Sequence, residues 1–521
     1  DNDQFSNEYL DLTFVVGDYR VINLSGGRFK GLSRAYTNPQ IDGHFAFQFP
    51  KSERFIGDAE LRSDIPDQSD TPDLSFQDEA YSYWLFRTMD MPTSDLRFIF
   101  IRFNGYDRGI QQDFYIPSLD FVDAWFGDND PNLYKNKGWR GEPFGVYEDA
   151  LGRKKKSRYR WNLRKKRTPV PDDDFTEAFE MADTLATAAD DLYVPRVKAI
   201  VDVQQWAQFF GILGALHAID HYGYINVQNG FTYTPSKTGA KLLVIDMDNT
   251  LQPGQHVGPY FPQPSYPIPH RMFNQIPEFR RVYWAVLKEL VNGPFQETSS
   301  TDYVNAWHQA FIDNNAAPTS PQAIISWINL RRPLLQTGLN SVASAFEIQT
   351  NAGNDFSTAN HIVTLAGISP VEVATMRING IENIVTYPAV NDWTLDVGLP
   401  EGTNVLTITG HDWRGSMVTS DTITVTVTQP PPSPVGKLVI TEIMYHPAVE
   451  AGEFIEVLNT SGDTFDMRGM HLNGVGHTFG GGLFIGPGEY KVVCENITVY
   501  QRKQQNAEIV LGDYAGDLDD G

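Results

Sequence analysis

The sequence has 521 residues, 41% of them hydrophobic and 12% aromatic, so it is long enough for about three or four domains that each bury a core. Its 65 acidic residues outnumber its 41 basic residues and give a formal charge of −24, which disfavours non-specific binding of nucleic acid because such a surface repels phosphate. Cys494 is the only cysteine, which excludes a disulfide within the chain and a cysteine-based zinc site.

The ends of the chain and its apolar runs bear on its location. No run of about eighteen apolar residues is present, so the sequence predicts no membrane span. The chain starts at Asp1 without Met and stops at Gly521 inside what reads as an unfinished β-domain. We therefore expect a processed or partial chain, from which a signal peptide could have been removed and which further domains could follow.

The first part of the chain, to about residue 150, alternates short β-like runs with clusters of turn residues. The clearest predicted strands are Leu10–Val16, Phe45–Phe49 and Leu96–Phe103. Between the last two, Asp78–Met89 predicts a helix. This pattern indicates a mixed α+β domain.

The next part is mainly helical. Asp202 is a suitable N-cap, and apolar residues then recur at helical spacing as far as His217, which predicts a helix buried on one side. A strand pair with a turn at Pro235–Gly239 follows, and its second arm is Lys241–Asp246. Further helices end with Pro321–Leu335.

The periodicity changes from helical to alternating near Asn340. We expect a β-sandwich over residues 341–428, a stiff proline-rich linker over 429–436, and a second β-rich domain over 437–521 that is incomplete. The strands predicted for the first of these domains are His361–Ile368, Val373–Asn379, Trp393–Leu399, Asn404–Gly410 and Thr422–Thr428.

The best candidates for catalytic or metal-binding residues follow the buried helix and the second arm of the strand pair. Asp220 and Asn229 belong to the first segment, and Asp246 and Asp248 to the second. Carboxylates with an amide oxygen suit Mg²⁺ or Mn²⁺ that carries nucleotide phosphates. The alternative is that Asp246 and Asp248 only cap the next turn. His217 lies on the apolar stripe and is read as a core histidine, whereas the role of the neighbouring His221 stays open.

These segments resemble the CotH kinase family. Asp220 falls on the first Asp of the family stretch "HWDG", Asn229–Tyr233 on "NYYLY" and Val244–Asp248 on "PWDMD". Asn132–Lys135 is similar to "gNLYK", and Ser326–Leu335 to the closing helix of the family. The order and spacing of these motifs carry the resemblance, over about residues 20 to 340.

The resemblance implies an atypical protein-kinase-like α+β domain over residues 1–340. Such a domain binds ATP with Mg²⁺ or Mn²⁺ and phosphorylates a secreted or surface protein. Carried over by position, Asp220 is the catalytic residue that orients or deprotonates the acceptor hydroxyl. Asp246 and Asp248 are the metal ligands, and Lys135 and Asn229 bind the cofactor. These roles match the positioning, metal and positive charge that phosphoryl transfer needs.

A second function class stays open. An ungapped match puts Gln111 where the family has Tyr, and Tyr115 where it has Glu. Ile219 and Ile245 stand where the family has Trp. The alternative is a catalytically inactive kinase-like surface or matrix protein that uses the former cleft as a binding or structural module.

Ten basic residues gather in the segment Arg153–Arg167. We expect it to form an exposed hairpin beside the mouth of the cleft, because that many cations cannot be buried unpaired. It is either a solvated loop or a docking site for an acidic polymer or acidic protein, with Tyr159 and Trp161 able to stack. No nucleic-acid partner is expected.

The β-domains also resemble known modules. Trp393 and Asn404 stand in a pattern similar to immunoglobulin-like domains, and Leu438–Pro447 with Glu453–Asn459 resembles the lamin-tail signature. The resemblances imply a bacterial-type protein outside the cell or on its surface. Three glutamates of the last domain could bind Ca²⁺, although exposed sheet carboxylates are the default reading: Glu442, Glu453 and Glu456.

Overall fold

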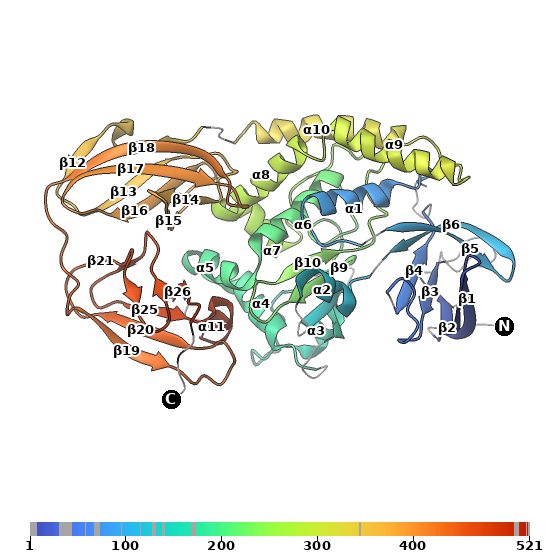
Figure 1. The fold of residues 1–521 in the computed structure, drawn as a ribbon, viewed down its shortest axis with the longest axis horizontal. Coiled ribbons are helices and arrows are strands. Elements are labelled where there is room, and N and C mark those ends of the chain that lie inside the picture. The colour runs from blue at the N-terminus through green and yellow to red at the C-terminus, as the bar shows by residue number, and fades with distance from the viewer. Residues whose placement is uncertain are drawn as a thin grey trace.

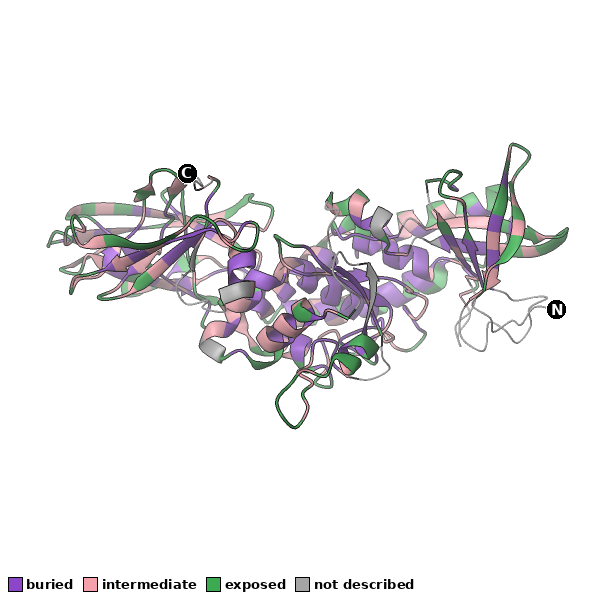
Figure 2. Cartoon of the chain, turned by 90° about the horizontal axis from the view of Figure 1, so that it is seen from below, coloured by how far each residue is buried: buried purple, intermediate pink, exposed green. Residues whose placement is uncertain are grey.

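The computed structural model describes residues 8–518 except 31–43, 58, 67–72, 95, 115, 128–131, 138–140, 168–172, 343–344, 505–509 and 517. The fold is elongated, with an N-terminal sheet at one end, helices in the middle and two β-rich units at the other end (Figure 1). Buried residues concentrate among the central helices and on the inner faces of the sheets (Figure 2). The predicted order, a mixed α/β region followed by β-sheets, is confirmed.

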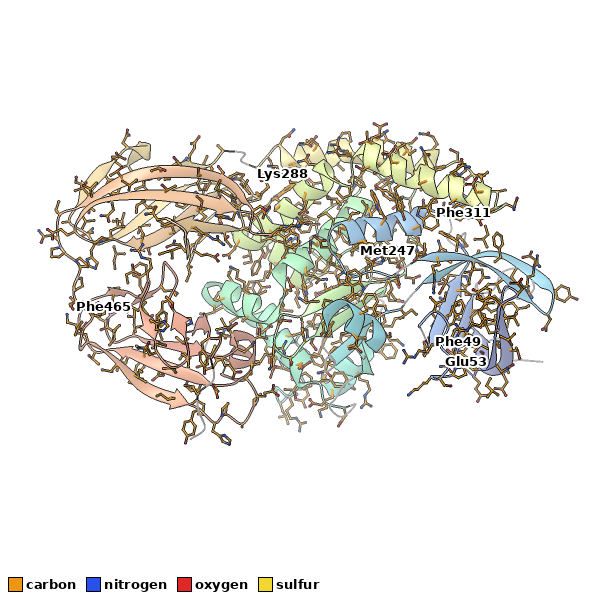
Figure 3. The ribbon with its side chains drawn as sticks, viewed as in Figure 1. Phe49, Glu53, Met247, Lys288, Phe311 and Phe465 are labelled. Carbon is orange, nitrogen blue, oxygen red and sulfur yellow. The ribbon has the colours of Figure 1, made fainter. Side chains whose placement is uncertain are left out.

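The N-terminal sheet has six strands in the order β1-β2-β3-β4-β6-β5, and all its pairs are antiparallel. One face is covered by aromatic side chains such as Phe45, Phe47 and Phe49, so this sheet has a core of its own (Figure 3). Its strands are β1 (Leu10–Val16), β2 (Arg20–Phe29), β3 (Phe45–Gln48), β4 (Glu60–Asp64), β5 (Arg97–Phe103) and β6 (Tyr106–Phe114).

The helix α1 and residues 116–342 form the helical part of the molecule, which encloses the largest core. A four-stranded antiparallel sheet of order β10-β9-β7-β8 lies within it. These strands are β7 (Asn132–Asn136), β8 (Leu163–Arg167), β9 (Gly230–Thr234) and β10 (Lys241–Val244). The helices are α1 (Asp78–Thr88), α2 (Leu119–Phe126), α3 (Lys156–Asn162), α4 (Thr176–Thr187), α5 (Asp190–Ile200), α6 (Val203–Leu216), α7 (Pro267–His270), the π-helix η2 (Arg271–Gln275), α8 (Pro277–Asn292), α9 (Glu297–Asp313) and α10 (Gln322–Leu339).

Helix α6 forms as the sequence predicts. The Asp202 side chain accepts a hydrogen bond from the Gln205 N–H at 3.1 Å, which satisfies one of the free donors of the first turn. The helix ends where His217 adopts a left-handed backbone with φ 52°. The prediction that β10 extends to Asp246 is wrong at its end. The strand stops at Val244, because Asp246 also has a left-handed backbone, with φ 62°, which cannot continue a strand.

Residues 345–428 form two sheets, of order β11-β13-β16 and β12-β18-β17-β14-β15. The predicted strands are confirmed to within a few residues, and Trp393 is fully buried between the sheets. The elements are β11 (Glu347–Ile348), the short 3-10 helix η3 (Thr350–Gly353), β12 (Phe356–Thr358), β13 (Ile362–Ile368), β14 (Thr375–Ile378), β15 (Ile381–Asn383), β16 (Asp392–Gly398), β17 (Gly402–His411) and β18 (Met417–Val427).

The last unit is built on a sheet of order β19-β20-β25-β26 and carries one helix, α11. Its elements are β19 (Leu438–Met444), β20 (Phe454–Asn459), β21 (Phe465–Asp466), β22 (His471–Leu472), β23 (His477–Thr478), β24 (Phe484–Ile485), β25 (Tyr490–Cys494), α11 (Ile497–Gln504) and β26 (Val510–Asp513). The domain boundaries given above stay predictions.

Helix α8 anchors the first β-unit to the helical part through one buried side chain. Arg281 is 2% exposed, and its guanidinium donates to the carbonyl oxygens of four residues of that unit: Ser369, Pro370, Val373 and Val390. Its charge also lies 4.5 Å from the ring centroid of Tyr387. Because one buried guanidinium serves several carbonyl acceptors of the β-unit at once, the contact fixes the two units against each other.

Candidate functional site

Asp220 lies just beyond the left-handed turn that ends α6, and two asparagines hold its side chain. The Asn226 amide donates to Oδ1, and Asn229 Nδ2 donates to Oδ2 at 3.1 Å. Asn229 Nδ2 also donates to the Asp220 carbonyl oxygen at 3.1 Å. The structure thus brings Asp220 and Asn229 into direct contact.

Asp246 follows β10, and the strained backbone around it is held from two sides. Its N–H donates to Tyr83 Oη of α1 at 2.9 Å, and the next N–H, of Met247, donates to Glu79 Oε1 at 3.0 Å. On the other side, His221 Nε2 donates to the Ile245 carbonyl oxygen at 3.0 Å. A left-handed non-glycine residue costs about 1 kcal/mol or more and persists where its surroundings fix it. These contacts therefore set the direction of the Asp246 side chain.

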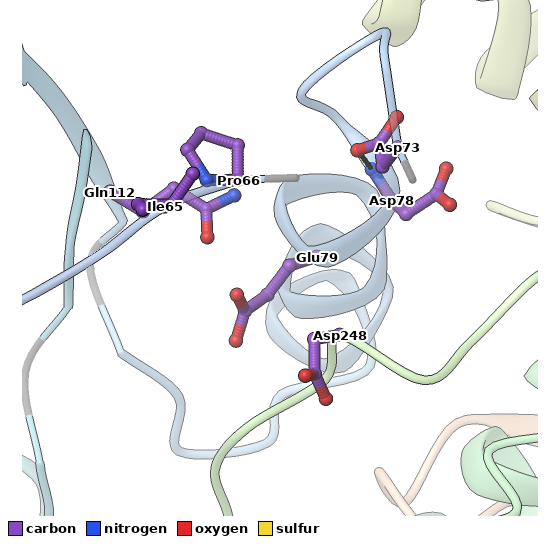
Figure 4. Close-up of a pocket in the computed structure, with 7 residues that line it drawn as sticks. All are labelled: Ile65, Pro66, Asp73, Asp78, Glu79, Gln112 and Asp248. Carbon is purple, nitrogen blue, oxygen red and sulfur yellow. Dashed lines mark hydrogen bonds between the residues drawn. The ribbon is translucent and has the colours of Figure 1, made fainter. Parts of the chain in front are cut away.

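Asp248 borders a small pocket between α1, the loop after β10 and the N-terminal sheet. The pocket is lined by Ile65, Pro66, Asp73, Asp78, Glu79, Gln112 and Asp248. The carboxylates of Glu79 and Asp248 lie next to each other in it (Figure 4). Among the described residues, nothing donates a hydrogen bond to the buried Oδ1 of Asp248. That oxygen is therefore the open acceptor of the site.

The charges of the site act on one another. Burial raises the pKa of Asp246, and the Asp64 carboxylate raises it further, whereas Lys30 and Lys135 oppose the rise. Lys30 Nζ lies 2.5 Å from Asp64 Oδ2, and the His44 ring contacts the other oxygen. Although burial alone would raise it, these two partners hold the pKa of Asp64 below its ordinary value. Positive charge thus approaches Asp246 from Lys30, just beyond the end of β2, and from Lys135 of β7.

The other carboxyl groups have raised pKa values as well. Burial, and then the charge of Asp246, raises the pKa of Asp220 to about 6 and that of Glu79 to about 8. Burial and the charges of Asp246, Glu79 and Asp220 raise the pKa of Asp248 well above its ordinary value. Charges that act on one another's neighbours in this way lie near each other. The backbone agrees, because the Ile245 N–H donates to the carbonyl oxygen of Asn229 at 3.1 Å and the Asn229 side chain holds Asp220. The structure therefore brings Asp220, Asp246 and Asp248 to one place.

Both histidines near Asp220 are neutral at physiological pH. Burial lowers the pKa of His217 and of His221 to about 4 in each case. His217 packs against Gly258, as expected for a core residue. His221, whose role the sequence left open, supports the Ile245 carbonyl and so acts as a structural donor.

Whether the site fits a divalent cation depends on its donors. Within the described ranges, no three side chains of His, Cys, Asp or Glu are placed so that they could hold a metal ion. Mg²⁺, however, binds through one or two carboxylates together with water and substrate phosphates. Asp246 and Asp248, with the open Oδ1 of Asp248 and the amide oxygen of Asn229, provide a donor set of this kind. The residues present fit the ion.

Several residues of the site were missed by the sequence reasoning, namely Lys30, His44, Asp64, Glu79 and Tyr83. No motif marks them. The only local signal was the predicted helix that contains Glu79 and Tyr83. Gln111, a departure from the family pattern, is buried in β6 opposite Ile99, and Tyr115 lies outside the described residues.

The segment Arg153–Arg167 was predicted to be an exposed hairpin that is not part of a core, and this prediction is wrong. It forms the end of a small turn, then α3, then β8. Tyr159, Asn162 and Leu163 are buried, because the helix packs on the core by this side while its cations point outward. Tyr159 is therefore not available for stacking. Trp161 is 67% exposed.

The glutamates of the last unit do not gather around one point. Glu453 is buried and accepts hydrogen bonds from Tyr514 Oη at 3.0 Å and the Leu518 N–H at 2.9 Å. Glu456 accepts one from Thr441 Oγ1 at 2.6 Å. No metal-holding group that includes Glu442, Glu453 or Glu456 is found in the described part of this unit.

The raised pKa values predict that Mg²⁺ stabilises the protein more at higher pH. In the folded state these carboxyl groups have pKa values above those of the unfolded chain, so without metal the stability falls as the pH rises through about 6 for Asp220 and about 8 for Glu79. Mg²⁺ binds the ionised form and should reverse this loss. Thermal unfolding with and without Mg²⁺ is expected to show an increase in Tm that is larger near pH 8 than near pH 6.

The matched variant for this experiment is Glu79→Gln, which removes the titrating group and keeps an acceptor for the Met247 N–H. Its Mg²⁺-induced increase in Tm should depend less on pH above about 7. An increase that is the same at every pH in the parent chain would contradict the assignment of the cation to these carboxylates.

Comparison with known proteins gives two family matches. The family model described as CotH kinase protein matches residues 61–328, slightly more than half of the chain, and the model described as Lamin Tail Domain matches residues 431–519. The first match contains every residue that the sequence analysis assigned to the site. No curated protein matches the chain. None of the described helices is both long and apolar enough to cross a membrane.

Proposed function

Because the chain belongs to the CotH kinase protein family, we propose that it is an exported atypical protein kinase that transfers the γ-phosphate of ATP to a secreted or surface protein. The observation that carries this proposal is the convergence of Asp220, Asp246 and Asp248. The Ile245 N–H, next to Asp246, donates to the carbonyl oxygen of Asn229, whose side chain holds Asp220, and the charge of Asp246 raises the pKa values of both Asp220 and Asp248. Phosphoryl transfer needs carboxylates for a metal, a carboxylate for the acceptor and positive charge for phosphate, all in one place.

Asp220 has the properties of the residue that receives the acceptor hydroxyl. Its pKa of about 6 lies close to neutral pH, where a general base is both ionised and able to accept a proton. Asn226 and Asn229 fix the carboxylate from two sides. The hydroxyl of a substrate Ser, Thr or Tyr would donate to Asp220 and be aimed at the phosphate.

Asp246 and Asp248 would hold a divalent cation, with the amide oxygen of Asn229 beside them. A bound Mg²⁺ or Mn²⁺ supplies charge neutralisation for the phosphates. Lys135 and Lys30 are the lysines whose charges lower the pKa of Asp246, so both stand where phosphate oxygens would lie. Asp64 positions Lys30 by an ion pair, and His44 contacts the other oxygen of the Asp64 carboxylate.

The test is incubation of the protein with labelled ATP, Mn²⁺ and casein. The parent chain is expected to label casein or itself, and Asp220→Asn should lower the rate by about a hundredfold or more, because the acceptor hydroxyl loses its base. Asp302→Asn, which changes an exposed aspartate on α9, should keep the parent rate.

Absence of labelling in the parent chain, with ATP and Mn²⁺ binding retained, would leave the second candidate, an inactive kinase-like surface or matrix protein that binds through this cleft. The observation in its favour is Gln111, which is buried in β6 where the family pattern has another residue.

Location outside the cell or on its surface, and an immunoglobulin-like identity for residues 345–428, are part of the same proposal. The two packed sheets and the buried Trp393 support the latter. The unit that matches the Lamin Tail Domain would then serve attachment or recognition. Together the β-units would hold the kinase-like part near its surface substrate.

A further inference from the structure

An open groove of about 490 Å³ lies beside α3, apart from the acidic site. Lys155 and Arg158 line it together with the aromatic rings of Tyr147 and Trp161. The Tyr147 hydroxyl donates to the Glu142 carbonyl oxygen at 2.6 Å, and the buried Tyr159 fixes α3 by donating to the Gly145 carbonyl oxygen at 2.9 Å. The walls of the groove are therefore rigid.

Neither cation of the groove forms an ion pair within the described part of the chain, although the charge of Lys155 contributes to the lowered pKa of the exposed Asp149, which pairs with Arg153. Arg158 lies 5.1 Å from the ring centroid of Tyr147 instead of against a carboxylate. The one acidic side chain in the lining, Glu148, is already paired with Lys154 at 3.0 Å. The groove therefore keeps a net positive charge on a chain whose formal charge is −24.

Neighbouring cations of the same run are different. Arg153 lies 2.7 Å from Asp149, and Lys156 lies 3.8 Å from Asp173. Both stand outside the lining of the groove. Some cations of the run Arg153–Arg167 thus form ion pairs at the surface. Lys155 and Arg158 form none and line the open groove.

Trp161 adds apolar surface to this charge. It is 67% exposed although it is one of the largest side chains. Trp, Tyr and Arg are the residues most enriched where protein interfaces concentrate their binding energy. A segment that combines carboxylates with backbone or apolar groups would contact both parts of the groove.

The strand register relates the groove to the acidic site. Arg164 of β8, Lys135 of β7, Phe231 of β9 and Leu243 of β10 form one row across the sheet. Three strand spacings of about 4.8 Å each put β8 about 14 Å from β10. The end of α3 lies at the β8 side of this row, and Asp246 follows at the β10 side. An extended peptide rises about 3.3 Å per residue, so at least about five residues are needed to pass from the β8 side to the β10 side.

We propose that this groove docks an acidic segment of the protein substrate, about five or more residues away in sequence from the phosphorylated hydroxyl. The proposal rests on the proposed kinase function and names its substrate class. Lys155 and Arg158 would pair with two carboxylates of that segment, and Trp161 would cover its backbone. Nucleic acid is the less suitable polyanion, because the negative field of the whole chain repels a long, uniformly charged phosphate backbone more strongly than a short segment with a few carboxylates.

The test uses the full chain without nucleotide and a fluorescein-labelled oligo-glutamate peptide, followed by fluorescence anisotropy. The double variant Lys155→Ala/Arg158→Ala is expected to weaken binding by about tenfold or more, and Trp161→Ala by about fivefold. The matched control is Arg153→Ala/Lys156→Ala, which removes the same charge from the same run outside the groove, and it should change binding by less than about twofold. Binding by the parent chain should weaken with added salt.

If the two double variants weaken peptide binding equally, the peptide binds through the general positive charge of the run and not through the groove, and the proposal is wrong. Tighter binding of a labelled oligothymidylate through the same two cations would overturn the peptide as occupant. Thermal unfolding of each variant shows whether it is folded. Since binding is measured without ATP, peptide binding without any phosphoryl transfer would contradict only the kinase function, whereas transfer to casein with no peptide binding would contradict only the groove.

Discussion

Replacement of Asp246 with Asn is expected to lower the transfer of labelled phosphate from ATP by about a thousandfold or more. The amide cannot supply the negative charge that holds a divalent cation. Asp248 and Asn229 would then have to bind the cation without the Asp246 carboxylate. Mg²⁺ should no longer raise the Tm of this variant as it raises that of the parent chain. The measurements are a casein-labelling assay and thermal unfolding with and without Mg²⁺.

Loss of structure does not account for this expected result. Burial and Asp64 raise the pKa of Asp246, so without metal its charge destabilises the folded state at neutral pH. A neutral Asn removes that cost, and the metal-free variant should have the Tm of the parent chain or a higher one. Asp18→Asn, at an exposed position, serves as the matched control and should change neither activity nor Tm. Retention of full activity by Asp246→Asn would refute the role of Asp246 as a metal ligand.

Elements defined by their own residues could be predicted closely. Asp202 and the apolar stripe after it specify α6, because capping and one-sided burial are local properties. The alternating residues of β13 and β16 specify strands in the same way. The proximity of Asp220 to Asp246 was also foreseeable, since each follows a buried element of one core.

The remainder of the site depends on contacts between distant segments. Tyr83 and Glu79 reach the backbone of Asp246 and Met247 from residues more than 160 positions away in sequence. Lys30, just after β2, acts on Asp246 from still further away in sequence, and no local pattern indicates which face of a helix or sheet will meet the site. The run Arg153–Arg167 did hold a usable signal, since Tyr159 and Leu163 are spaced as on one side of a helix, but its charge obscured it.

Arg331 is expected to be the most sensitive single side chain for the stability of the helical part. It is fully buried in α10 and donates to the carbonyl oxygens of Gly214 at 2.6 Å, Ala215 at 3.1 Å, His256 at 2.7 Å and Gly258 at 2.6 Å. Two of these belong to the last turns of α6, which leads to Asp220. It also donates to the Pro259 carbonyl oxygen at 3.4 Å. One guanidinium thus serves five carbonyl acceptors and joins α10 to the segment that positions the site.

Arg331→Met should lower the free energy of unfolding of the helical part by about 3 kcal/mol or more, because an apolar chain of similar length removes the guanidinium donor from several buried carbonyls at once. Urea unfolding followed by tryptophan fluorescence measures the change. Arg332→Met is the matched control. This neighbouring side chain is partly exposed and donates to one carbonyl, that of Val291, so its loss should cost less than about 1 kcal/mol. Equal destabilisation by the two substitutions would show that helix α10 depends on its charge in general and not on the carbonyls to which Arg331 donates.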